Sequence, residues 1–416
     1  MRYSPKEPKD IVRIAVAGSV DDGKSTLLGR LYYESGALFC DELATIEKAS
    51  ALHGFSGIDF SFVTDGLAAE RTQGITIDVA YRYFDLGDRR YILADVPGHE
   101  EYTANMVTGV SNADAVLLIV DVTKGLTVQA KRHLALARYF AGRSIMVAIN
   151  KIDLVGFSEE AFRAREADVR AYALKCGVSD LVCIPTSGLL GDMVVHALDR
   201  MPWYKGKTVA KLIEDVPQKK LPASGAWCMP IQCMVKTHHG ERWYAGEVAG
   251  GKINAGDEIK ILPSLMEARI ASMVVYGRVA KEAQSGEPIA VLFDREVDCT
   301  RGSTLIGAGA KAEATDTISV VLFITGKSGL TKDKPYLFTY VSLQVRVSLE
   351  QVTARFSFDE GTMGAANALS ERDLGEVVLR AHEHIFVLPS AKESHLRDVM
   401  IIDPYTHETV AVGKIL

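Results

Sequence analysis

The sequence predicts an α/β P-loop domain with a doubly wound, mostly parallel sheet, followed by two antiparallel β-barrel domains. Three observations predict this fold: apolar runs separated by helical patterns in the first half, a Gly-rich loop after the first run, and alternating apolar and polar residues in the second half. The chain has 416 residues, of which 48% are hydrophobic and 24% charged, which is typical of a globular protein with two to four domains.

Five apolar runs in the first half have the composition of strands that are buried on both faces. They are rich in Val, Ile and Leu and are bounded by Gly, Pro and Asp. They cover residues 11–17, 90–96, 115–122, 144–150 and 181–185. Because helical patterns lie between them, we expect one parallel sheet in a nucleotide-binding domain over residues 1–220.

The composition changes after residues 215–225, which are rich in Pro, Lys and small residues. Segments such as 344–358 alternate apolar and polar residues, a pattern that indicates antiparallel strands. Turn residues lie between such segments, at Asn254, Gly256, Gly286 and Gly302. The length of the chain after residue 220 suits two small barrels better than one. We therefore expect β-barrel domains over residues 221–312 and 313–416.

Charge and cysteine content argue against several classes of protein. The formal net charge is −6, which does not favour a phosphate-attracting field over the whole chain, and hence does not favour nucleic acid as a partner. The six cysteines are spread along the chain without zinc spacing, so we expect reduced thiols. The first ten residues are charged and contain prolines, and no apolar run reaches membrane-spanning length, so we expect a cytoplasmic protein with no membrane partner.

A phosphate-binding loop follows the first apolar run. Residues 18–25, GSVDDGKS, fit the pattern G-x-x-x-x-G-K-[ST] between a strand and a helical pattern. The glycines allow backbone N–H groups to surround phosphate oxygens. We expect Lys24 to reach the β- and γ-phosphates and Ser25 to bind Mg²⁺. The predicted phosphate-binding residues are Gly18, Ser19, Val20, Asp21, Asp22, Gly23, Lys24, Ser25 and Thr26.

Two further observations concern this motif. Asp21 and Asp22 have open roles: they can bind a monovalent cation or a Mg²⁺-bound water, or they can order the turn. A second Gly-Lys-Ser sequence at 326–328 lacks the leading glycine, because Val321 stands in its place, and lies in a β pattern. We interpret that second sequence as a turn.

The predicted magnesium site combines the loop with two later segments. Asp95 starts the sequence DVPG at the end of another apolar run, where it can hold a Mg²⁺-bound water while the N–H of Gly98 senses a γ-phosphate. Thr76, in the sequence RTQGITI at 71–77, has a hydroxyl that can complete the Mg²⁺ shell only while the γ-phosphate is present. The predicted metal ligands are Ser25, Thr76 and Asp95.

His99 follows Gly98 directly. We interpret it as the residue that orients the water attacking the γ-phosphorus, and the alternative is a surface histidine on a loop. With Lys24 and Thr76 it completes the predicted catalytic set. The other nine histidines have no matching partners, so we expect surface or structural roles for them.

The sequence NKID at 150–153 predicts guanine specificity. A carboxylate at Asp153 can accept hydrogen bonds from the N1–H and 2-amino groups of guanine, and ATP would leave it unpaired. We expect Asn150 to address the base edge and tie loops together, and the stem of Lys151 to cover the base. A further loop is expected to contact guanine through backbone groups, at Thr186, Ser187, Gly188 and Leu189. The predicted cofactors are therefore GTP/GDP and Mg²⁺.

Together these motifs resemble the translation-factor class of GTPases, typified by elongation factor Tu. Within that class the chain is similar to the large, GTP-hydrolysing subunit of bacterial sulfate adenylyltransferase, or ATP sulfurylase. The closer match comes from residues 20–27, 65–71, 74–84, 97–103 and 201–204, of which 78–84 and 201–204 are not ordinary elongation-factor features. The last hundred residues match only at 401–413, which leaves the identity of the partner open.

The resemblance implies a heterodimer or higher oligomer. A smaller adenylyltransferase subunit would bind ATP and sulfate and form adenylyl sulfate and pyrophosphate, and this chain would couple GTP hydrolysis to that unfavourable reaction. Two alternatives stay open. The altered carboxy-terminal third favours a divergent paralogue in specialised sulfate activation or another adenylyl transfer, whereas a GTP-dependent tRNA or translation factor would need a basic RNA-facing surface. The acidic balance and residues 78–84 argue against the latter.

Overall fold

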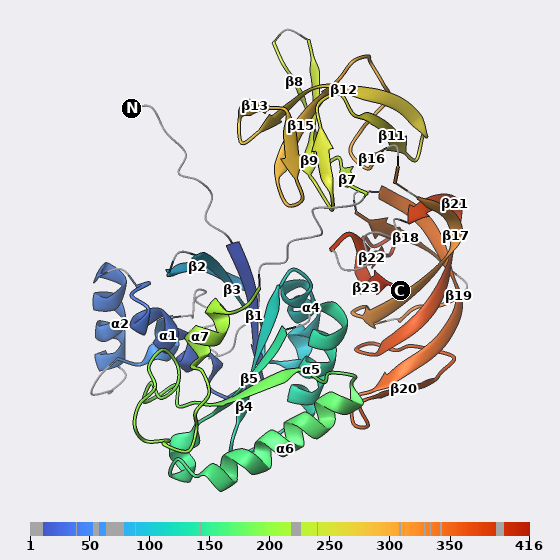
Figure 1. Cartoon of the computed structure of the whole chain (residues 1–416). Coiled ribbons are helices and arrows are strands. Elements are labelled where there is room, and N and C mark those ends of the chain that lie inside the picture. Colours follow the sequence, from blue (N-terminus) through green and yellow to red (C-terminus); the bar gives the residue numbers. More distant parts are fainter. Residues whose placement is uncertain are drawn as a thin grey trace. The chain divides into compact units, whose positions relative to one another are not determined.

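The computed structural model describes residues 11–38, 40–52, 58–63, 79–87, 89–141, 144–217, 226–238, 240–307, 309–310, 312–327, 329–332, 334–341, 343–387 and 395–416 (Figure 1). The chain divides into two compact units, one of residues 1–218 with 356–363 and one of residues 219–355 with 364–416. The finer division into three domains, with boundaries after residues 220 and 312, stays a prediction.

The first unit is built on a six-stranded sheet. Across the sheet the strands are β2 (Ala80–Leu86), β3 (Arg89–Asp95), β1 (Ile11–Gly18), β4 (Ala115–Asp121), β5 (Ser144–Asn150) and β6 (Leu181–Pro185). The five predicted runs form the five parallel strands, and every residue of β4 is buried. The edge strand β2 runs antiparallel to β3. The mostly parallel sheet that the apolar runs predict is therefore confirmed.

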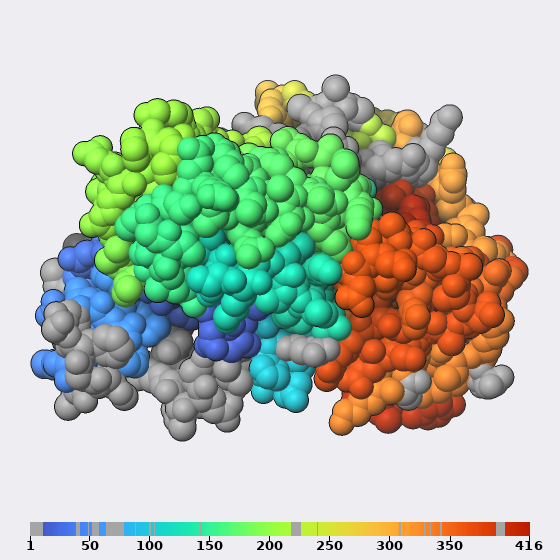
Figure 2. Space-filling model, turned by 90° about the horizontal axis from the view of Figure 1, so that it is seen from below, coloured from blue at the N-terminus to red at the C-terminus, as the bar shows by residue number. Residues whose placement is uncertain are grey.

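Helices connect these strands. They are α1 (Lys24–Glu34), α2 (Cys40–Leu52), α4 (Thr103–Ser111), α5 (Val128–Phe140), α6 (Glu159–Lys175) and α7 (Val209–Glu214), with 3₁₀ turns η1 (Phe60–Val63), η2 (Glu100–Tyr102) and η3 (Ile152–Val155). Capping hydroxyls begin three of them, since Thr127, Ser158 and Thr208 each accept a backbone N–H of the first turn. α5 packs against both α4 and α6, and Figure 2 shows the green residues that include α6 covering one face of this unit.

The second unit starts with an antiparallel half-barrel. Its strands, in order, are β7 (Cys228–Pro230), β16 (Thr304–Gly307), β11 (Glu258–Leu262), β12 (Met266–Val275), β15 (Pro288–Phe293), β9 (Arg242–Glu247) and β8 (Cys233–Lys236), with β13 (Arg278–Ala280) beside β12 and a small pair of β10 (Lys252–Asn254) and β14 (Glu282–Gln284). The rings of Tyr244 and Phe293 stack at 4.8 Å in its core. The predicted turn residues Gly256 and Gly286 adopt φ of 95° and 87°, which glycine tolerates.

The carboxy-terminal segment forms a closed six-stranded barrel. Its strands are β18 (Pro335–Tyr340), β22 (Asp398–Ile402), β23 (Thr409–Ile415), β17 (Glu313–Ile324), β21 (Leu374–Val387) and β19 (Leu343–Ser357), with β20 (Thr362–Ala365) beyond β19 and the 3₁₀ turn η5 (His395–Arg397) before β22. The pairing of β18 with β19 closes it. Alternate residues point inward, so Leu322, Phe338 and Val347 are fully buried. The second Gly-Lys-Ser sequence begins in the turn after β17, as predicted.

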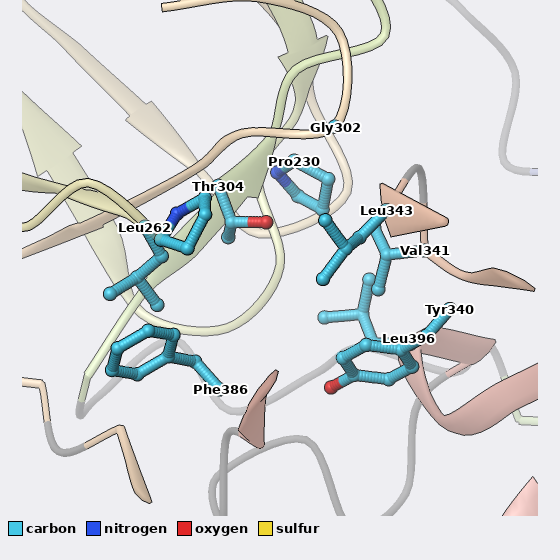
Figure 3. A pocket seen from close by; sticks show the side chains of 10 residues that line it. Pro230, Leu262, Gly302, Thr304, Tyr340, Val341, Leu343, Phe386 and Leu396 are labelled. Carbon is cyan, nitrogen blue, oxygen red and sulfur yellow. The ribbon is translucent and has the colours of Figure 1, made fainter. Parts of the chain in front are cut away.

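Residues of the half-barrel and of the closed barrel enclose a small cavity of about 20 Å³ (Figure 3). The side chains of Leu262 and Phe386 lie on one side of it and those of Tyr340 and Leu396 on another. A volume of this size holds one water molecule at most, and most of its lining residues are apolar. This cavity is therefore a packing feature of the second unit and not a ligand site.

The described residues also bear on the membrane-spanning segments and on the cysteines. None of the described helices is long and apolar enough to cross a membrane. The five cysteines whose side chains are described form no disulfide bond with one another. Burial raises the pKa of Cys183 and Cys228 to about 12, so both thiols stay protonated and unreactive near neutral pH.

Candidate nucleotide-binding site

The predicted site residues lie at one edge of the six-stranded sheet. The phosphate loop follows β1, Asp95 ends β3, Asn150 ends β5 and Thr186 follows β6. The carboxyl ends of parallel strands meet at the same edge, where nucleotides bind in open α/β sheets. The sheet thus brings together motifs that are far apart in the sequence. Thr76 lies outside the described residues.

The phosphate loop, residues 18–23, is held in a compact shape by its own hydrogen bonds. The N–H of Ser19 donates to Oδ2 of Asp22 at 3.2 Å, and the N–H of Asp22 donates to the carbonyl oxygen of Ser19 at 3.2 Å. Asp21 and Gly23 have positive φ of 65° and 85°. A Cβ on Gly23 would lie 2.5 Å from Nδ2 of Asn150, so only glycine fits there. Ser25 and Thr26 follow in the first turn of α1, where free backbone N–H groups attract phosphate.

Lys24 and Asp95 form an ion pair at the phosphate end of the site. Lys24 begins α1 and Asp95 ends β3, and their side chains are only 7% and 6% exposed. The pair therefore holds one positive and one negative charge where the motifs place a phosphate chain and a cation. The carboxylate of Asp95 and the hydroxyl of Ser25 supply oxygen ligands of the kind that Mg²⁺ prefers, so the residues present fit this ion.

The segment after Asp95 passes directly over the phosphate loop. A Cβ on Gly98 would lie 2.5 Å from the carbonyl oxygen of Gly18, so the two backbones touch at this point. His99 is half-buried, and its Nδ1 accepts a hydrogen bond from the N–H of Glu101 at 3.3 Å. In a neutral imidazole with Nδ1 as acceptor, the proton is on Nε2. Nε2 is then the nitrogen that can contact a water molecule.

Asn150 ties the phosphate loop to the loop after β6. Its Nδ2 donates to the carbonyl oxygen of Asp22 at 2.9 Å. Its Oδ1 accepts the N–H of Gly188 at 2.9 Å and the hydroxyl of Thr186 at 3.3 Å. The side chain is 2% exposed, so these bonds form in a dry environment where they are strong. Its expected contact with the base edge stays a prediction.

Asp121 is a site residue that the sequence reasoning missed. It ends β4, and its Oδ2 lies 2.9 Å from Nζ of Lys151, which also donates to the carbonyl oxygen of Asp21. Burial raises the pKa of Asp121, but hydrogen bonds from Thr123 and the charge of Lys151 outweigh it, so the pKa lies below its ordinary value. The sequence signal that could have identified Asp121 is its position at the carboxyl end of a fully buried apolar run.

Asp22 is a fully buried residue of the phosphate loop. Nζ of Lys124 lies 3.8 Å from Oδ1, an oxygen that has no hydrogen-bond partner among the described residues. Burial is the largest influence and raises the pKa of Asp22 to about 6. Its bond to the N–H of Ser19 favours the interpretation that this carboxylate orders the turn. Asp21, in contrast, is exposed.

Asp153 contacts the loop after β6. The hydroxyl of Ser187 donates to Oδ1 of Asp153 at 2.5 Å, and the N–H of Leu190 donates to the Ser187 hydroxyl at 3.1 Å. Ser187 is fully buried, whereas Leu189 is 62% exposed. In the part of the chain that the structure describes, Oδ2 of Asp153 has no hydrogen-bond partner. That oxygen is available to a donor on a base.

Comparisons with known proteins show the family to which the chain belongs. Residues 9–240 match the family described as the elongation factor Tu GTP binding domain. The chain is 35% identical to "Sulfate adenylyltransferase subunit 1" of Methylorubrum extorquens, over 98% of this chain and 87% of that protein. It is 34% identical to the protein of the same name in Cellvibrio japonicus, over 99% of this chain and 87% of that protein.

Among solved structures, the chain resembles the S. cerevisiae Ski7 GTPase-like domain, which was crystallised with GDP and inorganic phosphate. The TM-score is 0.53 at 18% sequence identity, and the match covers 98% of each chain. At this identity the likeness concerns the fold alone. It extends over the α/β unit and both β segments.

Proposed function

Because this chain belongs to the sulfate adenylyltransferase subunit 1 family of elongation factor Tu-like GTPases, we propose that it is the GTP-hydrolysing subunit of a heteromeric ATP sulfurylase. In this proposal a smaller subunit joins sulfate to the AMP part of ATP and releases pyrophosphate. GTP hydrolysis by this chain drives that reaction toward adenylyl sulfate. ATP and GTP are cytoplasmic nucleotides, so we expect the complex to act in the cytoplasm.

The single observation that carries this proposal is the similarity to sulfate adenylyltransferase subunits over 98% of the chain. This similarity includes both β segments, although the last hundred residues contain few recognisable family motifs. The relatives' name, "subunit 1", implies that they assemble with at least one other subunit. We therefore favour sulfate activation over tRNA delivery. The identity of the partner subunit decides whether the reaction serves primary or specialised sulfur metabolism.

In the proposed hydrolysis, residues of this chain bind and orient the nucleotide. Lys24 leaves Asp95 and contacts the β- and γ-phosphates, the N–H of Gly98 senses the γ-phosphate, and Asp153 with the loop after β6 selects guanine. Ser25, Thr76 and Asp95 would hold Mg²⁺, which would supply positive charge to neutralise the phosphate oxygens. His99 orients the attacking water through Nε2, because its Nδ1 is held by the N–H of Glu101.

The test is affinity purification of the tagged full chain from its native cell. The eluate is assayed for sulfate-dependent release of pyrophosphate from ATP, with and without GTP. We expect activity that rises with GTP, together with a co-purifying smaller subunit. The Lys24→Ala variant is the matched control, since it should retain the partner and lose the stimulation by GTP.

Two outcomes would contradict the proposal. A stable partner without sulfate-dependent activity would indicate another adenylyl transfer. Bound RNA that dissociates with increasing salt would indicate a translation factor.

A further inference from the structure

Helix α1 begins at the phosphate loop and also supports the loop that faces the base. A Cβ on Gly188 would lie 3.0 Å from Cα of Leu27, so this loop rests directly on the helix backbone. One turn further along, Nε of Arg30 donates to the carbonyl oxygen of Gly188 at 3.3 Å, and its Nη2 donates to the carbonyl oxygen of Leu189. Arg30 thus bonds two consecutive peptide units of the loop.

The guanidinium of Arg30 is itself held in place from two sides. Its Nη1 lies 3.6 Å from Oε1 of Glu34, a pair that is 17% and 14% exposed. Its central carbon lies 4.1 Å from the centre of the Phe60 ring, which allows a cation–π contact. An ion pair and an aromatic face therefore restrict its orientation, so its two donors are positioned before any nucleotide binds.

The two peptide units that Arg30 contacts lead to the base-reading groups. A peptide unit is planar, so fixing its carbonyl also fixes the N–H on its other side. Holding the Leu189 carbonyl orients the N–H of Leu190, which bonds Oγ of Ser187, and the Ser187 hydroxyl in turn donates to Asp153. Holding the Gly188 carbonyl orients the N–H of Leu189, which has no partner among the described residues and so can meet a base oxygen.

We propose that Arg30 is a positioning residue for guanine recognition: it fixes the peptide units at Gly188–Leu189–Leu190 and, through Ser187, the carboxylate of Asp153. The inference rests on the base position assigned to Asp153 in the proposed function. Arginine suits this role because its planar fork donates to two acceptors while its face stacks on an aromatic ring. A lysine ammonium is a point charge without a planar face, so it cannot stack on the Phe60 ring while two separate nitrogens donate to the two carbonyls.

The test measures the dissociation constants of GDP and ADP for the full chain and for Arg30→Ala and Arg30→Lys. We expect Arg30→Ala to weaken GDP binding at least tenfold and ADP binding less than threefold, so that discrimination between the bases falls. The kcat for GTP should change less than twofold while KM rises, because Lys24, Asp95 and His99 are untouched. Arg30→Lys should keep the charge on α1 and should fold like the wild type. Compared with Arg30→Ala, it should recover only part of the discrimination between GDP and ADP.

A control and a coupling measurement make the test specific. Arg163→Ala on α6 removes exposed ion pairs to Glu159 and Glu166 and should leave the discrimination unchanged. If Arg30 acts through Asp153, the effects of Arg30→Lys and Asp153→Asn on GDP affinity should be non-additive. Wild-type discrimination in Arg30→Lys, or full additivity, would overturn the inference. These measurements use the chain by itself, so a failed sulfate assay would refute the proposed function without affecting them.

Discussion

Lys24 and Asp95, which are 71 residues apart in sequence, meet as an ion pair of which neither side chain is more than 7% exposed. A buried charge without a partner costs several kcal/mol, so each of the two stabilises the other before a nucleotide binds. Binding of GTP with Mg²⁺ would replace this contact, since the phosphates take the ammonium and the cation takes the carboxylate. The pair therefore keeps the site charged and folded for its ligand.

Replacing Lys24 with alanine should abolish turnover and weaken GTP binding by at least a hundredfold. No other side chain of the loop can replace its charge at the phosphates, and the buried carboxylate of Asp95 loses the ammonium group that neutralises it. Titration calorimetry with GTP and a phosphate-release assay measure both effects. Lys211→Ala, which removes an exposed ion pair on α7, is the control. Unchanged affinity and turnover in Lys24→Ala would refute the site assignment.

Replacing Asp153 with asparagine should shift nucleotide preference from guanine to xanthine. A carboxylate accepts from the N1–H and 2-amino groups of guanine, whereas an amide can donate to the 2-oxo group of xanthine. The loss for GDP should be about 2–4 kcal/mol, the cost of an unpaired buried polar group together with a lost charged hydrogen bond. Displacement of a bound fluorescent nucleotide by GDP and by xanthosine diphosphate measures the two affinities. Retained guanine preference would argue against Asp153 as the base reader.

Replacing His99 with alanine should lower kcat for GTP by about a hundredfold, typical of lost water positioning, and leave GTP affinity nearly intact. The reason is that His99 is expected to contact the attacking water and not the nucleotide. Single-turnover hydrolysis and equilibrium binding separate the two quantities. If the variant hydrolyses GTP at the wild-type rate, His99 is only a surface residue of the loop.

Replacing Asp22 with asparagine should stabilise the nucleotide-free protein near neutral pH. The pKa of Asp22 is raised from 3.8 to about 6, so between these values the folded state binds more protons than the unfolded state, and stability falls as pH rises. This difference in pKa lowers the free energy of unfolding by about 3 kcal/mol at most above pH 6. An amide does not titrate and can still accept from Ser19.

Urea unfolding of both nucleotide-free proteins at pH 4.5 and pH 7.5 measures this effect. We expect the variant to gain about 1–3 kcal/mol over the wild type at the higher pH and much less at the lower pH. Lys207→Ala, which removes an exposed ion pair with Asp215, is a control without this pH dependence. An equal difference at both pH values would contradict the prediction.

The outline of the fold was predictable because its signals are local. The runs at 11–17, 115–122 and 144–150 are apolar on both faces, and they form the central parallel strands. The alternation at 344–358 predicts a strand with one buried face, and β19 covers nearly the same residues. The antiparallel edge strand β2 was not predicted, because an exposed edge strand carries no continuous apolar run. The two antiparallel β segments were predicted, whereas their strand orders were not, since strand pairing is a long-range property.

The sequence by itself determined which chemical groups are available to this protein: Lys24 in a predicted phosphate loop, acidic and histidine groups at 95–99, and the carboxylate of Asp153, which we predict to read the base. Only the tertiary structure decided which groups act on one another, because those contacts join residues that the strand order brings together. Asn150 holds the phosphate loop and the loop after β6, and Asp121 holds Lys151. Arg30 shows the same principle, since nothing in a helical sequence indicates that one of its side chains donates to carbonyl groups 158 and 159 residues away.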